Sequence, residues 1–247
     1  MSEATRERTV GGRGVLEGAF ALLEALVREE EAGLTALSMA SGLPKATAYR
    51  LLGQLIEEGA VQRRAGRYRL GPRMFRLGQT WQPAQLLRTA VAHPMRQLVA
   101  ATDRGAFTLS LTDRGDTMLI ASVNREIEEA YPFRPGALLP PGTAAEQILT
   151  AAHPNPVPPE GFSSLEWRRL TTAARDRGMA YDLDTHRYGV ACVAAPVRGP
   201  AGEVVAALAA TVFEPDRIPA LGHAVQQAAG LVTTHLARLL RSNRAGL

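Results

Sequence analysis

The sequence predicts an α+β fold in two domains, and three observations lead to this prediction. First, 247 residues are long for one domain and sufficient for two, each with its own core. Second, the N-terminal third reads as successive helices followed by a short β-hairpin. Third, the remainder alternates apolar strands with helices, a pattern typical of an antiparallel sheet with helices packed on it.

The composition indicates in which cellular compartment the protein works and whether it associates with a membrane. Hydrophobic residues make up 46% of the chain and charged residues 21%, and no apolar run reaches the roughly 18 residues that a membrane span requires. Residues 1–8 lack the apolar core of a signal peptide, and Cys192 is the single cysteine, so no internal disulfide is possible. We expect a cytoplasmic protein without membrane association.

Positive charge is concentrated in one segment, although the formal net charge is only +4. Between Glu58 and Asp103 the chain carries arginines and no acidic residue. Such a concentration suggests a polyanionic partner, while a solvated basic surface explains the charge by itself equally well. The arginines of this segment are Arg63, Arg64, Arg67, Arg69, Arg73, Arg76, Arg88 and Arg96.

A first helix is predicted at 15–29, after a tail at 1–12 that we expect to be disordered. Apolar residues recur there at steps of three and four, which places them on one face of an amphipathic helix. This predicted buried face consists of Leu16, Ala19, Phe20, Leu23, Leu26 and Val27.

Two further helices follow, with a tight turn between them. A short helix fits 35–41, Gly42 provides the backbone freedom for the turn, and Pro44 suits the first turn of a helix that runs to Glu58. A glycine inside this helix costs roughly 1 kcal/mol relative to alanine, but small residues on its exposed face permit another surface to come close. The buried stripe is predicted to be Ala48, Leu51, Leu52, Leu55 and Ile56. The opposite face carries Ala46, Thr47, Arg50, Gly53 and Gln54, with Lys45 and Tyr49 on its flanks.

A short hairpin completes the N-terminal domain, which we place at 13–71. Strands are predicted at 61–64 and 67–70, joined by Ala65 and Gly66 as a two-residue turn. A helix pair followed by a basic hairpin has the geometry of a winged helix-turn-helix, whose second helix reads the major groove of DNA. The residues expected to approach bases and neighbouring phosphates are Lys45, Ala46, Thr47, Tyr49 and Arg50. The hairpin arginines expected to hold the DNA backbone or enter a minor groove are Arg63, Arg64, Arg67 and Arg69.

These residues resemble a known family, the IclR family of bacterial transcriptional regulators. The resemblance is carried by Gly42-Leu43-Pro44-Lys45-Ala46-Thr47-Ala48-Tyr49-Arg50-Leu51-Leu52, then Glu58-Gly59, then Gly66-Arg67-Tyr68-Arg69-Leu70-Gly71. The family pattern is Gly-Leu-Pro-Lys-Ser-Thr-Val-His-Arg-Leu-Leu, followed by Gly-x-Tyr-x-Leu-Gly. Ala46 stands where the family has serine and Tyr49 where it has histidine, so we expect an operator preference different from that of other members.

A linker helix is expected at 72–83 between the domains, with an interruption at Gln82-Pro83. A long helical stretch follows at 86–102, in which Pro94 should kink or split the helix. The second domain then covers 84–247 and is expected to bind an effector and to oligomerise.

Antiparallel strands interleaved with helices make up the second domain. Strands are predicted at 106–111 and 117–123 around a turn at 113–116, and at 190–197 and 203–212 around a turn at 199–202. An extended segment is predicted at 179–184, helices at 165–177 and 218–240, and loops at 131–142 and 153–160.

A capping box opens a further helix in this domain. Thr143 and Glu146 occupy the two reciprocal positions of the box, and the helix is expected to reach about Ala152. The box uses the amides at the cap and at Glu146, so the amides of Ala144 and Ala145 stay free. They could bind a carboxylate or phosphate, or water as at any capped helix.

The second domain resembles the effector-binding domain of the IclR family, which has a GAF-like fold. The resemblance rests on Arg177-Gly178-Met179-Ala180-Tyr181-Asp182 and Gly189-Val190-Ala191-Cys192-Val193-Ala194-Ala195-Pro196-Val197. It implies a small-molecule effector bound by Ala144, Ala145, Asp182, Cys192, Ala209 and Thr211. The family usually has serines at the positions of Ala209 and Thr211, and a glycine-lysine pair at Glu146-Gln147. These departures argue against a small anionic effector and leave a larger or more apolar one, or none.

Catalysis and metal binding are two alternatives that the residues raise. Cys192, His186 and Asp182 could serve as nucleophile, base and orienting group, but a cysteine inside an apolar strand is more commonly a neutral buried thiol. The five histidines are scattered without the spacing of a metal site. We therefore expect no enzyme activity, no cofactor and no metal site.

The sequence thus predicts a ligand-responsive, sequence-specific DNA-binding transcriptional regulator. One reading module buries too little surface for genomic specificity, so we expect a homodimer on a palindromic operator, and the family resemblance implies dimers paired into tetramers. Effector binding would change the dimer geometry through the helix at 72–81 and so the half-site spacing. Two other functions stay open: a constitutive DNA-binding regulator whose C-terminal domain only dimerises, and a catalytic GAF-like protein.

Overall fold

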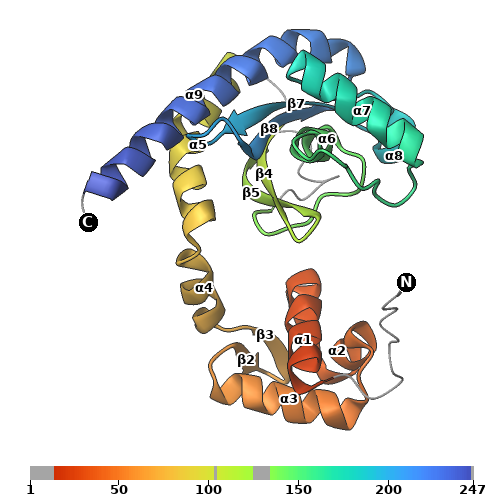
Figure 1. Cartoon of the computed structure of the whole chain (residues 1–247). Helices are drawn as coiled ribbons and strands as arrows, with labels where there is room; N and C mark the ends of the chain where they lie inside the picture. The colour runs from red at the N-terminus through yellow and green to blue at the C-terminus, as the bar shows by residue number, and fades with distance from the viewer. Residues whose placement is uncertain (1–13, 103–104, 125–133, 246–247) are drawn as a thin grey trace, which may run out of the picture. The chain divides into compact units, whose positions relative to one another are not determined.

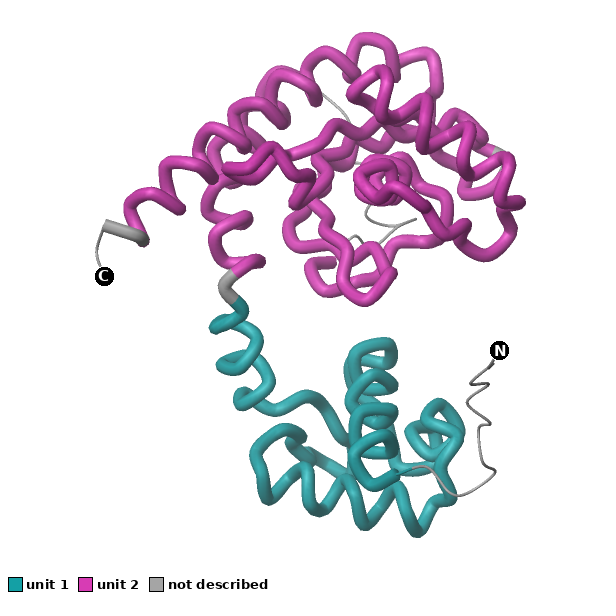
Figure 2. The backbone as a smooth tube through the Cα atoms, in the orientation of Figure 1, with its two compact units in different colours: residues 1–81 teal, residues 82–247 magenta. Residues whose placement is uncertain are grey.

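A computed structural model of the chain describes residues 14–102, 105–124 and 134–245. The chain divides into two compact units, unit 1 at Met1–Trp81 and unit 2 at Gln82–Leu247 (Figure 2). The predicted linker at 72–83 is therefore divided, because its helical part belongs to unit 1 and its last two residues begin unit 2. The predicted tail at 1–12 lies outside the described residues.

Unit 1 combines helices with a small antiparallel sheet (Figure 1). Its helices are α1 (Val15–Glu29), α2 (Leu34–Ser41), α3 (Lys45–Glu57) and α4 (Pro72–Gln79). Its strands are β1 (Glu31–Gly33), β2 (Val61–Arg64) and β3 (Arg67–Leu70), in the order β1-β3-β2. The predicted helices and hairpin are confirmed, whereas β1 was missed because three residues are too few to show an alternating pattern.

The turn between α2 and α3 depends on a left-handed glycine. Gly42 has a φ of 65° and its amide donates to the carbonyl of Met39. The Leu43 amide donates to the Ser38 carbonyl at 3.1 Å, and the Ser38 hydroxyl donates to the Leu43 carbonyl at 2.7 Å. These bonds satisfy the end of α2 and fix the direction in which α3 begins.

The buried face of α1 agrees with the predicted one at Leu23 and Leu26 and differs from it elsewhere. Leu16, Phe20 and Val27 are 75%, 60% and 61% exposed. The helix packs on α2 and α3, and an added Cβ at Gly18 would lie 3.0 Å from the Leu51 side chain. The side of α1 that packs on α2 and α3 therefore carries Gly18. This side is rotated about the helix axis relative to the predicted apolar stripe. The residues that α1 buries are Gly18, Leu22, Leu23, Ala25 and Leu26.

The β2–β3 hairpin has the predicted two-residue turn. Ala65 and Gly66 have φ values of 47° and 81°, and positive φ at both central residues matches a type I′ turn, which suits the twist of a hairpin. Tyr68 is only 2% exposed and anchors the hairpin in the core of unit 1.

Unit 2 contains an antiparallel sheet with helices on both faces. Its strands are β4 (Ala106–Asp113), β5 (Asp116–Asn124), β6 (Ala180–Asp182), β7 (Ala191–Arg198) and β8 (Val204–Val212). Its helices are α5 (Gln82–Ala101), α6 (Ala144–Ala151), α7 (Ser164–Arg177), α8 (Thr185–Tyr188) and α9 (Ile218–Ala245), with a 3-10 turn at Pro215–Arg217.

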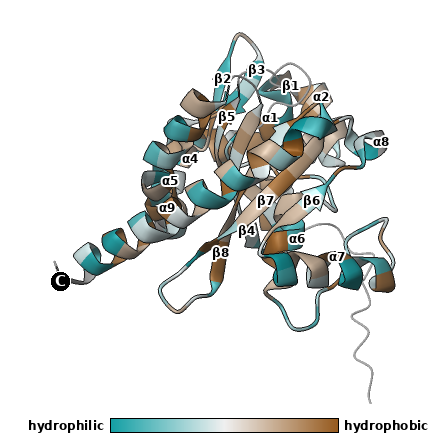
Figure 3. Cartoon of the chain, turned by 90° about the horizontal axis from the view of Figure 1, so that it is seen from above, coloured by the Kyte–Doolittle hydropathy of each residue, from teal (hydrophilic) through white to brown (hydrophobic). Residues whose placement is uncertain are grey.

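The strands of the described part of unit 2 have the order β5-β4-β8-β7-β6. Alternate residues of β7 and β8 point to opposite faces, which separates two cores. Leu208 and Val193 face α5 and α9, while Cys192 and Ala209 face α6, with α7 beside α6 (Figure 1). The central strands are among the most hydrophobic elements of the chain (Figure 3). The predicted α+β fold with a winged helix-turn-helix and an antiparallel-sheet domain is thus confirmed.

Some predicted boundaries in unit 2 are wrong. Helix α5 begins at Gln82, with Pro83 in its first turn, and continues through Pro94 as one element. Its buried residues on either side of that proline pack in the same core as α9, and this packing offsets the lost hydrogen bond. Helix α8 was not predicted, and the predicted loop at 131–142 is described only from 134 onward.

Candidate functional sites

The outward face of α3 is small, polar and basic. Lys45, Ala46 and Arg50 are exposed, Tyr49 is 58% exposed, and Thr47 is half-buried. The inward face places Ala48, Leu51 and Leu52 in the core of unit 1. The predicted DNA-reading residues of α3 therefore lie together on the solvent side of the helix, and the first acidic residue after Lys45 is Glu57.

The hairpin of β2 and β3 presents its arginines on two faces. Residues paired across the strands share a face, and Arg64 pairs with Arg67 while Gln62 pairs with Arg69. These four residues form the outer face of the hairpin, which we call the wing face. Arg63 pairs with Tyr68 and lies instead on the inner face, with its guanidinium 5.3 Å from the centre of the Tyr68 ring.

Two of the wing arginines have partners within the chain. The Arg67 side chain lies 3.3 Å from a carboxylate oxygen of Glu31 and also donates to the Glu31 carbonyl. Arg69 donates to the side-chain oxygen of Gln62 at 3.3 Å. Arg64 and Arg67 are directly opposed across the strands, and like charges in that position repel each other. An anion bound against the wing face would relieve this repulsion.

The second predicted site lies on the sheet face beneath α6. Asp182 pairs with Cys192, Cys192 pairs with Thr211, and Ala209 pairs with Thr108, so these side chains are neighbours on adjacent strands. The thiol of Cys192 lies 3.3 Å from the hydroxyl of Thr211. The strand register therefore brings together residues that are far apart in the sequence.

A cavity of about 40 Å³ opens between this patch and the start of α6. Five of the six residues that the family resemblance implied as effector contacts line this cavity, namely Ala145, Asp182, Cys192, Ala209 and Thr211. Ala144 is fully buried but is not a lining residue, because its position at the start of α6 directs it into the core. The lining residues that were not predicted are Thr108, Leu139, Pro140, Thr143, Tyr188 and Val190.

Tyr188 and the segment before α6 close the cavity on one side. The hydroxyl of Tyr188 donates to the Pro141 carbonyl at 2.8 Å, which joins α8 to that segment. Tyr188 belongs to a helix that lacks any apolar period, and Leu139 and Pro140 belong to an irregular segment. Neither carried a sequence pattern that indicated a site.

Burial governs the ionisation of the acidic groups at this site. It raises the pKa of the Asp182 carboxyl, although the hydrogen bond from the Asp184 amide lowers that pKa in part. It also raises the pKa of the Cys192 thiol to about 12, against the lowering effect of the Thr211 hydrogen bond. A thiol with so high a pKa stays protonated near neutral pH, which is unlike a nucleophilic cysteine.

The capping box at the start of α6 forms only in part. The Thr143 hydroxyl accepts from the Glu146 amide at 3.4 Å, as predicted. The Glu146 carboxylate, however, accepts from the amide of Gly142 rather than from that of Thr143, because the chain turns at Gly142, where φ is 85°. Glu146 thus places a carboxylate beside the helix start, and burial raises its pKa.

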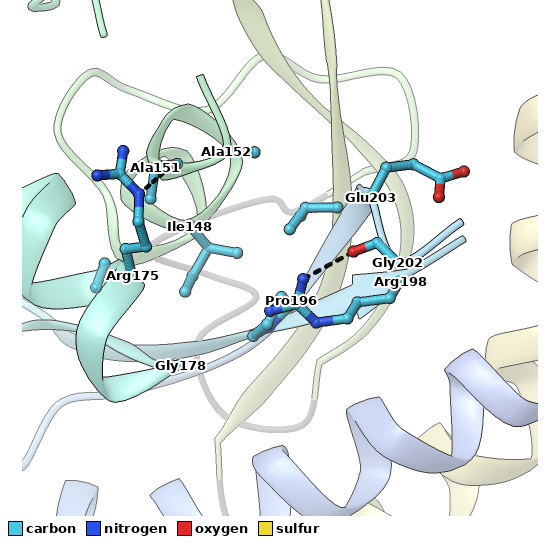
Figure 4. A pocket seen from close by; sticks show the side chains of 11 residues that line it. Ile148, Ala151, Ala152, Arg175, Gly178, Pro196, Arg198, Gly202 and Glu203 are labelled. Carbon is cyan, nitrogen blue, oxygen red and sulfur yellow. Dashed lines mark hydrogen bonds between the residues drawn. The ribbon is translucent and has the colours of Figure 1, made fainter. Parts of the chain in front are cut away.

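A larger groove of about 260 Å³ lies farther along the same side of the sheet, between α6, α7 and the β7–β8 turn. Figure 4 shows Arg175 on one side of this groove and Arg198 on the other, with Ile148 and Pro196 between them. Arg175 donates to the Ala151 carbonyl at 2.9 Å and Arg198 to the Gly202 carbonyl at 2.9 Å. Both guanidinium groups therefore bind nearby backbone carbonyls. This structural role accounts for the two arginines without a ligand in the groove.

The alternative functions can be compared with the described residues. The His186 side chain is outside the described residues, so the proposed Cys192–His186–Asp182 arrangement has no described geometry. Within 14–102, 105–124 and 134–245 no cluster of histidine, cysteine, aspartate and glutamate could hold a metal ion. Among the same residues, no helix is both long and apolar enough to span a membrane.

Two family models match the chain, one for each unit. The model described as "IclR helix-turn-helix domain" matches residues 15–65. The model described as "Bacterial transcriptional regulator IclR C-terminal" matches residues 84–233. The first match contains α1 to β2 and the second contains the sheet of unit 2.

Characterised relatives and solved structures agree with these matches. The glycerol operon regulatory protein of Streptomyces griseus is 30% identical over 198 residues, covering 74% of this chain and 78% of that protein. The HTH-type transcriptional regulator KdgR of Dickeya chrysanthemi is 28% identical over 211 residues, covering 76% and 67%. An IclR homolog from Microbacterium hydrocarbonoxydans, solved with 4-hydroxybenzoate, has the same fold with a TM-score of 0.76 at 19% identity, covering 90% of this chain and 99% of that chain. With its helix-turn-helix DNA-binding domain and its IclR-type C-terminal domain, the chain belongs to the IclR family of bacterial transcriptional regulators.

Proposed function

We propose that this regulator binds a palindromic operator as a homodimer and that a small molecule held beneath α6 alters this binding. The observation that carries the DNA-binding part is the exposed face of α3, which has no acidic residue from Lys45 to Ile56, together with the wing face that follows it in the chain. Lys45, Ala46, Thr47, Tyr49 and Arg50 would approach base edges and nearby phosphates. Arg63, Arg64, Arg67 and Arg69 would hold the backbone, so affinity should fall steeply with salt.

Self-association is supported by the apolar residues that α1 leaves exposed. Leu16, Phe20 and Val27 lie at four- and seven-residue steps on one side of the helix and are more than half exposed. A stripe of this kind is typical of a surface that a partner covers. We propose a second copy of the chain as this partner, since two reading modules are needed for a palindromic site. We also propose that two such dimers associate into a tetramer.

Effector binding is supported by the cavity and by one structural neighbour. The Microbacterium protein was solved with 4-hydroxybenzoate, and this supports a small organic molecule as the effector. In this chain we propose contacts from Ala145, Asp182, Cys192, Ala209 and Thr211, with Ala144 supporting the site from the core side. Binding would change the dimer geometry through α4, the helix that precedes unit 2 in the chain.

A second function is favoured by the size of the cavity. About 40 Å³ is far below the roughly 300 Å³ at which ligand pockets usually begin. The chain could therefore be a constitutive DNA-binding regulator whose C-terminal domain only dimerises. A catalytic role for Cys192 is not proposed, because its thiol is buried and protonated. Regulation of bacterial DNA would place the protein in the cytoplasm.

The test begins with selection of duplexes by the wild-type protein from a randomised palindromic library. The Arg50→Ala variant should then bind the selected duplex about fivefold to 150-fold more weakly, since one good base contact contributes about 1–3 kcal/mol. Its melting temperature should not change, because Arg50 is exposed. Arg169→Ala, an exposed arginine of α7, is the matched control and should bind like wild type. Failure of the wild-type protein to enrich any sequence would contradict the proposed function.

A further inference from the structure

Gly53 stands in the middle of α3, where a glycine is unfavourable. The helix runs from Lys45 to Glu57, so Gly53 is not at either end and cannot act as a cap. Glycine in a helix interior loses more backbone entropy on folding than alanine and exposes more backbone to water. Glycine at this position therefore lowers the stability of α3 relative to alanine, and the surface that Gly53 occupies decides whether a function accompanies this cost.

The part of the chain that the structure describes does not require a glycine at this position. Gly53 is not among the residues with positive φ, so its backbone conformation is open to any residue. Among the described residues, an added Cβ at Gly53 would meet no atom within 4 Å, and the position is exposed. Gly18, in contrast, is kept small by the neighbouring Leu51 side chain at 3.0 Å. Neither conformation nor internal packing thus excludes a side chain at Gly53.

The position of Gly53 relative to the reading residues suggests an external reason. Gly53 lies three residues after Arg50 and seven after Ala46, so all three share one side of the helix. Ala46 and Arg50 belong to the surface proposed to face DNA. A recognition helix in the major groove contacts base edges through its N-terminal residues, and the rest of its groove-facing side lies close to the duplex between the two sugar-phosphate backbones. A side chain at Gly53 would hold this part of α3 away from the duplex.

We propose that Gly53 is a positioning residue for operator recognition, whose missing side chain lets the middle of α3 lie directly against the DNA. This inference rests on the proposed function, because it assumes that α3 enters the groove. It adds that the depth of entry, and with it the reach of Arg50 and Thr47 to base edges, is set at Gly53. Stability and specific binding should therefore respond in opposite directions when Gly53 is replaced.

The experiment uses the full chain with Gly53→Ala and Gly53→Gln. Both replacements are better helix formers than glycine, so the melting temperature should rise by about 2–4 °C. Affinity for the duplex selected by the wild-type protein should fall about tenfold for Gly53→Ala and about a hundredfold for Gly53→Gln, because displaced base contacts are lost. Affinity for a random duplex of equal length should stay within about twofold, because phosphate contacts supply most of non-specific binding.

Gly230→Ala is the matched control. Gly230 lies inside α9, is exposed, and would also place an added Cβ in empty space, so this variant should gain stability and keep wild-type operator affinity. Wild-type operator affinity in both Gly53 variants would overturn the inference and leave the proposed function standing. A lower melting temperature in Gly53→Ala would also overturn it, since the glycine would then serve the fold. If the wild-type protein selects no duplex, the proposed function and this inference fail together.

Discussion

The two proposed sites differ most in how their residues are exposed. On α3 and the wing face, the side chains of Lys45, Arg50 and Arg64 point into solvent. Beneath α6, Cys192 and Thr211 are 7% and 4% exposed. Exposed residues add little to folding stability, so their identity reflects what the surface must bind. Buried residues serve packing as well as any ligand, so their identity alone does not establish a binding role.

This difference predicts that substitutions at buried positions lower the free energy of unfolding. Substitutions at exposed positions of the proposed DNA-binding surface should change binding and leave the free energy of unfolding nearly unchanged. The largest expected effect compares positions within one helix. Leu22→Ala should lower the free energy of unfolding by about 2–5 kcal/mol, because Leu22 is fully buried. Phe20→Ala, at a position 60% exposed, should change it by less than about 0.5 kcal/mol in the monomer. Chemical denaturation at low protein concentration measures both free energies, and a larger loss for Phe20→Ala than for Leu22→Ala would show that α1 packs as the sequence alone suggested.

The next effect concerns the cavity beneath α6. Ala209 lines this cavity, and Ala209→Leu adds three carbon atoms to a space of about 40 Å³. A compound that stabilises the wild-type protein by about 2.7 kcal/mol at a hundredfold excess over its Kd should no longer shift the melting temperature of this variant. Screening metabolites by thermal shift identifies the compound.

Val204→Leu is the control for this experiment. Val204 is on the same strand but lines the larger groove rather than the cavity, so its variant should keep the thermal shift. A compound that stabilises Ala209→Leu but not Val204→Leu would move the effector site to the groove. The absence of any stabilising compound would favour the constitutive regulator.

A smaller effect is expected at the wing face. The double variant Arg64→Gln/Arg69→Gln should bind the selected duplex about 10-fold to 100-fold more weakly at low salt, and the slope of log affinity against log salt should fall by about 2. Fluorescence anisotropy over a salt series measures both quantities. Arg168→Gln/Arg169→Gln on α7 removes the same charge from exposed positions and should leave the slope unchanged. An unchanged slope in the wing variant would mean that the wing does not contact phosphate.

The share of the structure that could be predicted from the sequence differs between the DNA-binding surface and the cavity beneath α6. The helix boundaries of α3 and the turn at Ala65-Gly66 follow from local chemistry, namely proline, glycine and apolar spacing, and both were predicted. The exposed side of α1 was not predicted, because Leu16 and Phe20 fit an apolar stripe as well as Leu22 does. Only the packing of α1 on α2 and α3 decides which of these residues are buried. Tyr188 and Thr108 line the cavity through tertiary closure, which leaves no local signal. Asp182 and Cys192 could be named from the family resemblance alone.

The smallest effect concerns the buried thiol and its pH dependence. Burial raises the pKa of Cys192 to about 12 in the folded protein, above its value in the unfolded chain. The folded state therefore keeps a proton that the unfolded state releases, so stability is retained below the unfolded pKa and is lost as pH rises above it. By pH 10 the wild-type protein should lose about 1.4 kcal/mol more than Cys192→Ala does. Parallel pH profiles in denaturation experiments would contradict the burial of this thiol.

The central claim is that the outward face of α3 and the wing face form the DNA-binding surface. Hydrogen–deuterium exchange of the full chain, with and without the selected duplex, tests it most directly. The account predicts slower exchange at 45–54 and 61–70 when the duplex is bound, with the buried strands of unit 2 unaffected. Unchanged exchange in these two segments, together with protection elsewhere in the chain, would contradict it.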